Sequence, residues 1–166
     1  STTVTGNYKT QYYVIVNSTH GNPTTSQWVD KWSSLSVSVQ SPADTIPEQS
    51  RWRCTGFSID HGALQQGISY TFSSVQTPHE IEFYWAKQFR LVVETDMSGL
   101  TILGSEWFDS GTTVTISVDT PHEVTEGHRF IFISWASTGT NVAPINNSTS
   151  PETTVTMYNY CTVKAT

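Results

Sequence analysis

The sequence has few charged residues and no long apolar segment. Charged side chains make up 13% of the 166 residues, about half the usual share, and the formal net charge is −6. Eight Lys and Arg in an acidic chain are too few to neutralise a phosphate backbone, so we expect no nucleic-acid partner. No apolar run approaches the roughly 20 residues that a spanning helix needs, so we expect no membrane span.

Sequence motifs of enzymes are also missing. We find no Gly-x-Ser-x-Gly elbow, no phosphate-binding loop and no Cys–His pairing. The tetrapeptide Thr-Pro-His-Glu occurs twice, at residues 77–80 and 120–123. The two copies fall at different stages of the repeat described below, so we interpret them as chance identity in exposed loops rather than a metal site. The sequence therefore predicts a protein that is not an enzyme and needs no cofactor or metal.

Cysteine is scarce, and this limits the covalent chemistry of the chain. Cys54 and Cys161 leave room for one disulfide bond, which requires an oxidising compartment, and their positions in the sequence do not decide whether they meet. Three glycosylation sequons begin at Asn17, Asn146 and Asn147. They are candidate sites only if the protein is exported.

Aromatic and hydroxyl side chains are abundant, and apolar residues alternate with polar ones. Aromatic residues account for 12% of the chain, which argues against disorder. The segments Leu35–Val39 and Val114–Val118 place apolar residues on one face and Ser or Thr on the other, a period of two that is typical of strands. Similar short segments, among them 81–85 and 129–135, are separated by turn residues. This pattern predicts an all-β fold.

The pattern also repeats. Trp28-Val29-Asp30 recurs 79 residues later as Trp107-Phe108-Asp109, and the apolar series from Leu35 recurs from Val114 at the same offset. We therefore predict two tandem small β-sandwich modules, residues 9–87 and 88–166, with a β-grasp-like arrangement as the alternative. In each module the repeated Asp is expected to accept backbone hydrogen bonds at a turn. A calcium site is the less favoured interpretation, because no cluster of oxygen ligands surrounds either Asp.

The second module carries a motif that resembles a known family. It comprises an apolar strand, an aromatic hairpin, an aromatic-Trp strand, Val-Thr-Met and a closing Thr-Val-x-Ala strand, at residues 89–93, 107–115, 129–135, 155–157 and 162–165. This pattern is similar to divergent InlB B-repeat-type modules, found in tandem in bacterial and archaeal surface proteins. The first module departs from it at Lys31-Trp32 and Thr55-Gly56-Phe57. The resemblance implies an extracellular or cell-surface stalk, spacer or adhesive unit.

Residues 1–8 form a surplus N-terminal strand in this scheme, because Thr3–Gly6 matches the closing strand Thr162–Ala165. One interpretation is a fragment of a longer array. The other is strand donation to a neighbouring copy, which gives a head-to-tail polymer. The residues expected to take part in donation are Thr2, Val4, Gly6 and Tyr8.

We thus expect a structural or adhesive extracellular subunit of a filament, pilus or surface layer, with copies of itself or neighbouring surface proteins as partners. The alternatives are a carbohydrate-binding module and the stalk of a larger secreted protein. For glycan binding the candidate stacking residues are Trp28, Trp32, Trp85 and Trp107. The favoured interpretation is that an aromatic at a strand end closes a small core, because Trp28 and Trp107 repeat in register.

Overall fold

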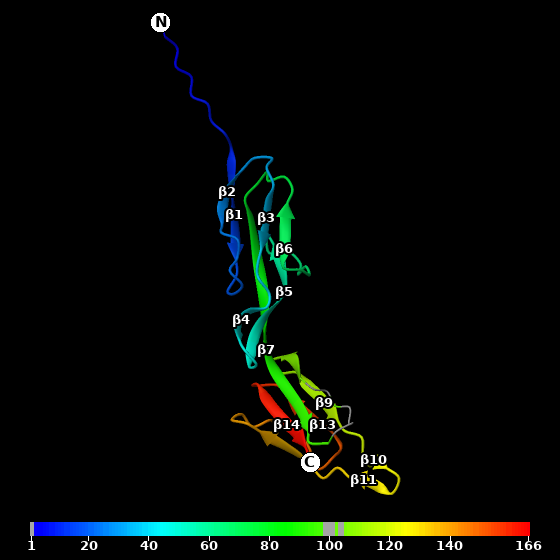
Figure 1. Ribbon diagram of the computed structural model, residues 1–166. Helices are drawn as coiled ribbons and strands as arrows, with labels where there is room; N and C mark the ends of the chain where they lie inside the picture. Colours follow the sequence, from blue (N-terminus) through cyan, green and yellow to red (C-terminus); the bar gives the residue numbers. More distant parts are fainter. Residues whose placement is uncertain (1, 98–101, 103–104) are drawn as a thin grey trace. The chain divides into compact units, whose positions relative to one another are not determined.

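The computed structural model describes residues 2–97, 102 and 105–166, which form an all-β structure, as the alternation predicts (Figure 1). Within these residues there is no helix. The chain divides into two compact units. The first consists of Ser1–Asp44 and Trp52–Ala86, and the second of Thr45–Arg51 and Lys87–Thr166.

The first unit is built around strand β1 (Gln11–Asn17). This strand pairs antiparallel with β2 (Gln27–Asp30) and parallel with the start of β7 (His79–Thr95). A separate antiparallel pair joins β3 (Leu35–Ser38) to β6 (Ser69–Phe72). Two further strands, which pair with each other, have residues in both units: β4 (Ala43–Ile46) and β5 (Ser50–Ile59).

The second unit is built around the later part of β7, which pairs parallel with β14 (Cys161–Ala165) and antiparallel with β8 (Ser105–Asp109). Strand β12 (Trp135–Thr138) adds to β14. Two more antiparallel pairs complete the unit: β9 (Thr113–Ser117) with β13 (Glu152–Thr156), and β10 (His122–Thr125) with β11 (His128–Phe130).

Each unit has its own apolar core, and the alternate apolar residues of strands from two different sheets contribute to it. In the first unit Val14 and Val37, from β1 and β3, are at most 1% exposed. In the second unit Leu91 and Ile116, from β7 and β9, are equally buried. Apolar residues at alternate positions thus meet between the sheets, while the hydroxyl residues between them face outward.

The turns after β2 and β8 make matching main-chain hydrogen bonds. The N–H of Trp32 donates to the carbonyl of Val75 at 2.8 Å, and the N–H of Gly111 donates to the carbonyl of Met157 at 2.7 Å. Trp32 and Gly111 both adopt left-handed backbone conformations, with φ of 73° and 85°. Glycine adopts this conformation without steric cost and tryptophan does not, so the first unit keeps the turn with a less suitable residue.

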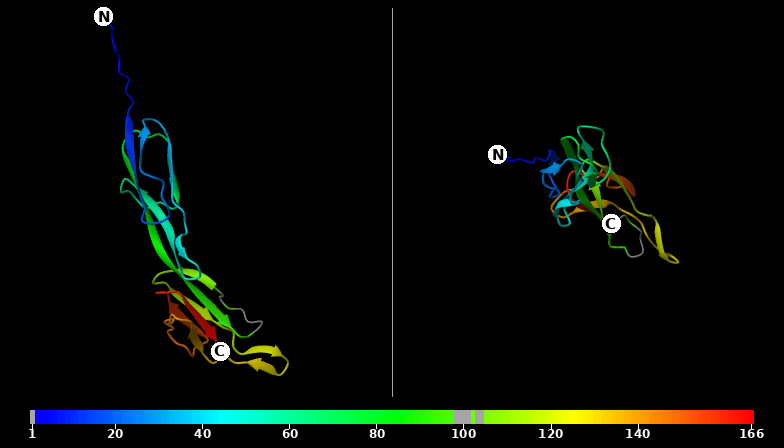
Figure 2. Two further views of the ribbon diagram at one scale, coloured as in Figure 1. Left: turned by 60° about the vertical axis from the view of Figure 1, so that its left-hand side comes forward. Right: turned by 90° about the horizontal axis from the view of Figure 1, so that it is seen from above.

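Two sequence-based strand assignments need correction. The segment 129–135 is not one strand, because β11 ends at Phe130 and β12 begins at Trp135. The intervening Phe132 N–H donates instead to the hydroxyl of Thr120. Residues 2–10 contain no strand either and are exposed throughout, as an extended segment before β1 (Figures 1 and 2).

Candidate functional site

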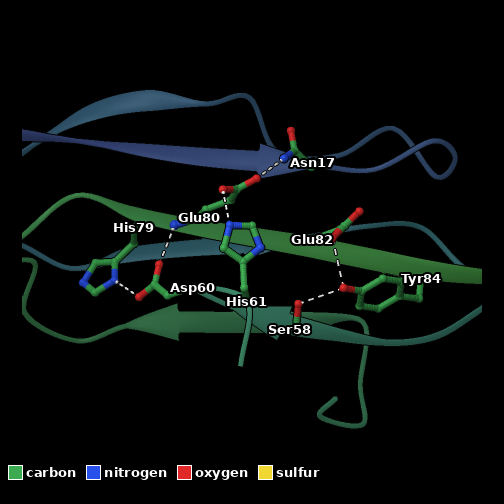
Figure 3. A network of polar contacts seen from close by, with 8 residues as sticks. All are labelled: Asn17, Ser58, Asp60, His61, His79, Glu80, Glu82 and Tyr84. Atoms are coloured by element: carbon green, nitrogen blue, oxygen red, sulfur yellow. Dashed lines mark hydrogen bonds and ion pairs between the residues drawn. The ribbon is translucent and has the colours of Figure 1, made fainter. Parts of the chain in front are cut away.

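A group of titratable side chains lies where the loop after β5 meets the start of β7 (Figure 3). The carboxylate of Asp60 is 2.7 Å from Nδ1 of His79 and accepts the N–H of Glu80 at 2.8 Å. The main-chain N–H of Asp60 in turn donates to the carbonyl of Glu80 at 2.8 Å. Asp60 has a φ of 50°, and these contacts hold it in that conformation.

The same group extends along β7 through Glu80. One carboxylate oxygen of Glu80 accepts the side-chain amide of Asn17 at 2.6 Å, and the other is 3.3 Å from Nε2 of His61. Further along the strand, the Tyr84 hydroxyl donates to Glu82 at 2.9 Å and lies 3.0 Å from the Ser58 hydroxyl (Figure 3). These contacts tie β1 and the loop after β5 to β7.

The electrostatics of this group favour a structural role. Burial acts to raise the pKa of Asp60, but hydrogen bonds from the Glu80 N–H and from His79 outweigh it and hold that pKa below its usual value of 3.8. A carboxylate held ionised accepts hydrogen bonds and is a poor proton donor near neutral pH. In the part of the chain that the structure describes, no three His, Cys, Asp or Glu side chains are placed to hold a metal ion.

The repeated Asp30 and Asp109 accept hydrogen bonds, although from side chains that the sequence reasoning did not identify. Gln11 Nε2 donates to Asp30 at 2.6 Å, and Gln88 Nε2 donates to Asp109 at 2.8 Å. Lys9 also donates to Asp30, and this bond, followed by that from Gln11, lowers the pKa of Asp30. The turn itself is closed by the Asp main-chain carbonyl, at 3.0 Å from the N–H of Ser33 in the first unit. The sequence feature that could have identified these donors is a Gln at the equivalent position of β1 and β7, Gln11 and Gln88.

The four candidate stacking tryptophans have different environments. Trp28 and Trp32 are exposed on the first unit, at 64% and 61%. Trp107 is half-buried, with the guanidinium of Arg51 4.4 Å from its ring centroid. Trp85 packs against the core of the first unit. Trp28 and Trp32 are therefore available to a ligand, whereas Trp85 has a packing role.

The cysteines are free thiols in the structure and belong to different cores. Cys54 packs in the core of the first unit and Cys161 in that of the second. Burial raises the pKa of the Cys161 thiol, which keeps it protonated and poorly reactive. The bond considered from the sequence is thus not formed here, because each thiol is packed among the apolar residues of its own unit.

The three sequon asparagines are exposed. Asn17 ends β1, and its side-chain amide is engaged by Glu80. Asn147 accepts hydrogen bonds from both the N–H and the hydroxyl of Thr149, at 3.1 Å and 3.0 Å, which closes a turn on the protein surface. The side chains of Asn146 and Asn147 are therefore accessible in an exposed loop before β13.

The candidate strand-donation residues, Thr2, Val4, Gly6 and Tyr8, lie in the extended segment 2–10. Val4 is 92% exposed and Tyr8 is 98% exposed. The alternation of Thr with Val in this segment is typical of a strand, yet the segment has no strand partner within the described chain. It presents backbone hydrogen-bonding groups and two large side chains to solvent.

The structure also contains an apolar pocket that the sequence did not reveal. It has a volume of about 180 Å³ and lies in the second unit, lined by residues from the ends of β7 and β14 and from β10 and β11. Its apolar lining includes Met97, Val118, Ile131, Ile133 and Ala165. Ile131 and Ile133 are 63% and 73% exposed. The prediction of one strand across residues 129–135 contained no indication of a pocket at these side chains.

Comparison with known proteins gives no relative. The chain matches no family model, no curated protein and no solved structure. Across residues 2–97, 102 and 105–166, no helix is long and apolar enough to cross a membrane.

Proposed function

We propose that the chain is a non-enzymatic structural or adhesive subunit of an extracellular assembly, such as a filament, pilus or surface layer. In this proposal the segment Thr2–Tyr8 pairs with a second copy of the chain and so links copies head to tail. The observation that carries the proposal is the segment itself, which has a strand-like pattern, exposed Val4 and Tyr8, and no strand partner among the residues that the structure describes. Unpaired strand-forming segments are ready donors for addition to a sheet.

The proposal includes a modular origin for the two units, as two copies of one small β-sandwich module of the InlB B-repeat type. Supporting it, β1 and the later part of β7 have the same partners: an antiparallel strand ending in Asp and a parallel closing strand. The Gln–Asp hydrogen bond occurs at the same register in both units, as Gln11↔Asp30 and Gln88↔Asp109. Strand β7 thus closes the first module and opens the second.

The outer faces of both units suit an assembled structure. Paired strands place hydroxyl groups side by side on the surface, with Ser36 and Thr71 2.9 Å apart and Thr113 and Thr156 3.3 Å apart. Such neutral surfaces add little like-charge repulsion between neighbouring copies. Glycans on the exposed Asn146 or Asn147, in an oxidising extracellular compartment, would extend from this surface.

Amide hydrogen exchange of the intact protein tests the proposal. If Thr2–Tyr8 pairs with a second copy, exchange at alternate residues of the segment slows as the protein concentration rises, because every second N–H group becomes hydrogen-bonded to the neighbouring strand. Exchange at exposed loop residues such as Ser148 serves as the control and stays constant. Equal, fast exchange at every residue from Thr3 to Tyr8 at all concentrations contradicts the proposal.

A carbohydrate-binding function is the second candidate, favoured by the exposed tryptophans. Trp28 lies beside Tyr13, with ring centroids 5.1 Å apart, and Trp32 lies in the turn that follows β2. Exposed aromatic faces of this kind can stack on sugar rings. Glycan-array binding that is lost in Trp28→Ala and Trp32→Gly, and kept in Trp107→Ala, would support this function over self-assembly alone.

A further inference from the structure

The loop before β13 holds one of the three glycosylation sequons, Asn147-Ser148-Thr149, in a closed turn. The side-chain carbonyl of Asn147 accepts the main-chain N–H of Thr149 at 3.1 Å and the Thr149 hydroxyl at 3.0 Å. Both bonds use Oδ1, so neither occupies the amide nitrogen Nδ2, the atom to which an N-linked sugar is attached. A sequon is defined by an Asn and a hydroxyl two residues later, and here these two groups are already in contact.

Main-chain contacts hold this turn on the second unit. The N–H of Asn147 donates to the hydroxyl of Thr153 at 2.9 Å, and Thr153 is buried. The carbonyl of Ser148 accepts the N–H of Trp135 at 2.7 Å, and Trp135 is part of the core. The turn is therefore fixed in place, while Asn147 itself is exposed.

The other two sequons have a different geometry. Asn17 ends β1, which pairs with β7 at this point, and its Nδ2 is engaged as a donor to Glu80 at 2.6 Å. The main-chain N–H of Asn146 donates to the carbonyl of Thr154 at 3.0 Å, so this residue is tied to β13. Among the described residues, no hydrogen bond joins the Asn146 amide to the hydroxyl of Ser148. Asn147 is thus the acceptor whose sequon is arranged for modification in the folded chain.

A polar hollow of about 300 Å³ lies beside this turn. It is formed by the loop and by the outer face of the β9–β13 pair, and besides the two asparagines its lining includes Thr115, Ser150, Glu152 and Thr154. Thr115 and Thr154 lie opposite each other in the register of these strands. The volume is at the lower end of the range for small-molecule sites, which suits a single sugar ring.

The groups around the hollow match the chemistry of a neutral sugar. Sugar hydroxyls donate and accept hydrogen bonds, as the Thr hydroxyls and Asn amides of the lining do. The carboxylate of Glu152 can accept charge-assisted bonds from such hydroxyls, which are stronger than bonds between neutral groups. The described lining contains no basic side chain, so an acidic sugar would meet the like charge of Glu152 without compensation.

We propose that Asn147 is the acceptor of an N-linked glycan whose first, neutral sugar packs in this hollow. This inference rests on the proposed extracellular location and is independent of self-association. In the transfer, Nδ2 forms a bond to C1 of the sugar of a lipid-linked diphosphate donor. The bond between C1 and the diphosphate oxygen breaks, and the diphosphate leaves with that electron pair. A base of the transferring enzyme takes one proton from the amide.

Glycan transfer to the folded chain tests the acceptor assignment. The purified intact protein is incubated with a single-subunit oligosaccharyltransferase and a lipid-linked oligosaccharide of neutral sugars, and peptide mass spectrometry measures the occupancy of each sequon. A short sequon peptide in the same reaction is the control for enzyme activity. We expect about tenfold more glycan at Asn147 than at Asn17 or Asn146, because two hydrogen bonds already hold the turn.

Two matched variants separate the overlapping sequons. Thr149→Ala removes only the sequon of Asn147 and should abolish modification there. Ser148→Ala removes only the sequon of Asn146 and should leave the occupancy of Asn147 unchanged. Similar occupancy of all three asparagines, or an unmodified Asn147, overturns the assignment.

Urea unfolding tests the sugar site. Protein modified at Asn147 should unfold at a higher urea concentration than unmodified protein, because the sugar finds its partners only in the folded state. Thr154→Val keeps the sequon and a similar shape but removes one hydroxyl of the hollow, so this shift should become smaller. Thr156→Val, on the same strand but outside the lining, is the control and should keep the shift.

An equal shift in the Thr154→Val and Thr156→Val proteins, or no shift on modification, refutes packing of the sugar in the hollow. Because both tests use purified protein and are blind to assembly, their failure refutes this site alone. The assembly claim is tested separately by electron microscopy.

Discussion

In the first unit the indole Nε1 of Trp85 donates a hydrogen bond of 2.9 Å to the hydroxyl of Ser18, 67 residues earlier in the chain. This bond joins the closing strand of the unit to the end of its opening strand β1. The ring packs on the unit's core and against the turn at Gly21. Trp85 therefore closes one end of the core, which makes its removal a direct test of the packing.

Trp85→Ala is expected to destabilise the protein by about 2–4 kcal/mol, somewhat less than a fully buried tryptophan, since the side chain is half-buried. The loss leaves a cavity beside Ser18 and Gly21. Urea unfolding followed by circular dichroism measures the change. Trp28→Ala, at a residue that is 64% exposed, is the control and should cost less than about 1 kcal/mol. Equal effects of the two substitutions would contradict the assigned role of Trp85.

The repeated Gln–Asp bonds differ in burial, which predicts unequal energies. Gln88 is 6% exposed, and besides donating to Asp109 it accepts a hydrogen bond from Arg51 Nε at 2.8 Å. Gln88→Ala removes a partner from each neighbour in a partly buried site and should cost about 1–3 kcal/mol. Gln11→Ala, at the exposed counterpart, should cost less than about 1 kcal/mol. A larger effect at Gln11 in chemical unfolding would refute this assignment.

Trp32 and Gly111 occupy the same left-handed turn position in the two units, and substitutions there should change stability in opposite directions. Gly111→Ala should destabilise by about 1 kcal/mol through its backbone alone, because an added Cβ there meets no atom within 4 Å. Trp32→Gly should stabilise the protein by up to about 1 kcal/mol, since the indole is 61% exposed and contributes little packing. Thermal unfolding measures both variants. Destabilisation by Trp32→Gly would show that the exposed ring contributes more to stability than its backbone strain costs.

Acidification should release the contacts of Asp60. Its folded pKa lies below the usual 3.8, so its contribution to stability is complete above about pH 4–5 and is lost as the pH falls through the folded value. Asp60→Asn should therefore be less stable than the unmodified protein at pH 6, and this difference should shrink at pH 3. Unfolding at both pH values, with Glu126→Gln as an exposed control outside the network, measures the effect. A difference independent of pH would mean that the Asp60 carboxylate charge is not what stabilises the loop.

How far the sequence predicts this fold depends on whether a feature is local. Alternation predicts strands such as β9, where Val114 and Ile116 are buried between exposed threonines, because side chains on a strand alternate between its faces. The split of the segment 129–135 could not be predicted, since the Phe132 N–H bonds to Thr120, a residue that only folding brings near. The same holds for the pocket beside Ile133 and for the Asp60–His79 contact, which joins residues 19 positions apart.

Electron microscopy of the purified protein tests the central claim, that Thr2–Tyr8 links copies of this chain, because it shows directly whether the protein forms ordered assemblies. The account predicts filaments or other ordered assemblies of the intact chain, and only single particles after residues 1–8 are deleted. The deletion removes a segment that is exposed over residues 2–8, so both units should remain folded by circular dichroism. Single particles of the intact protein at all concentrations, or assemblies that persist unchanged after the deletion, would contradict the account.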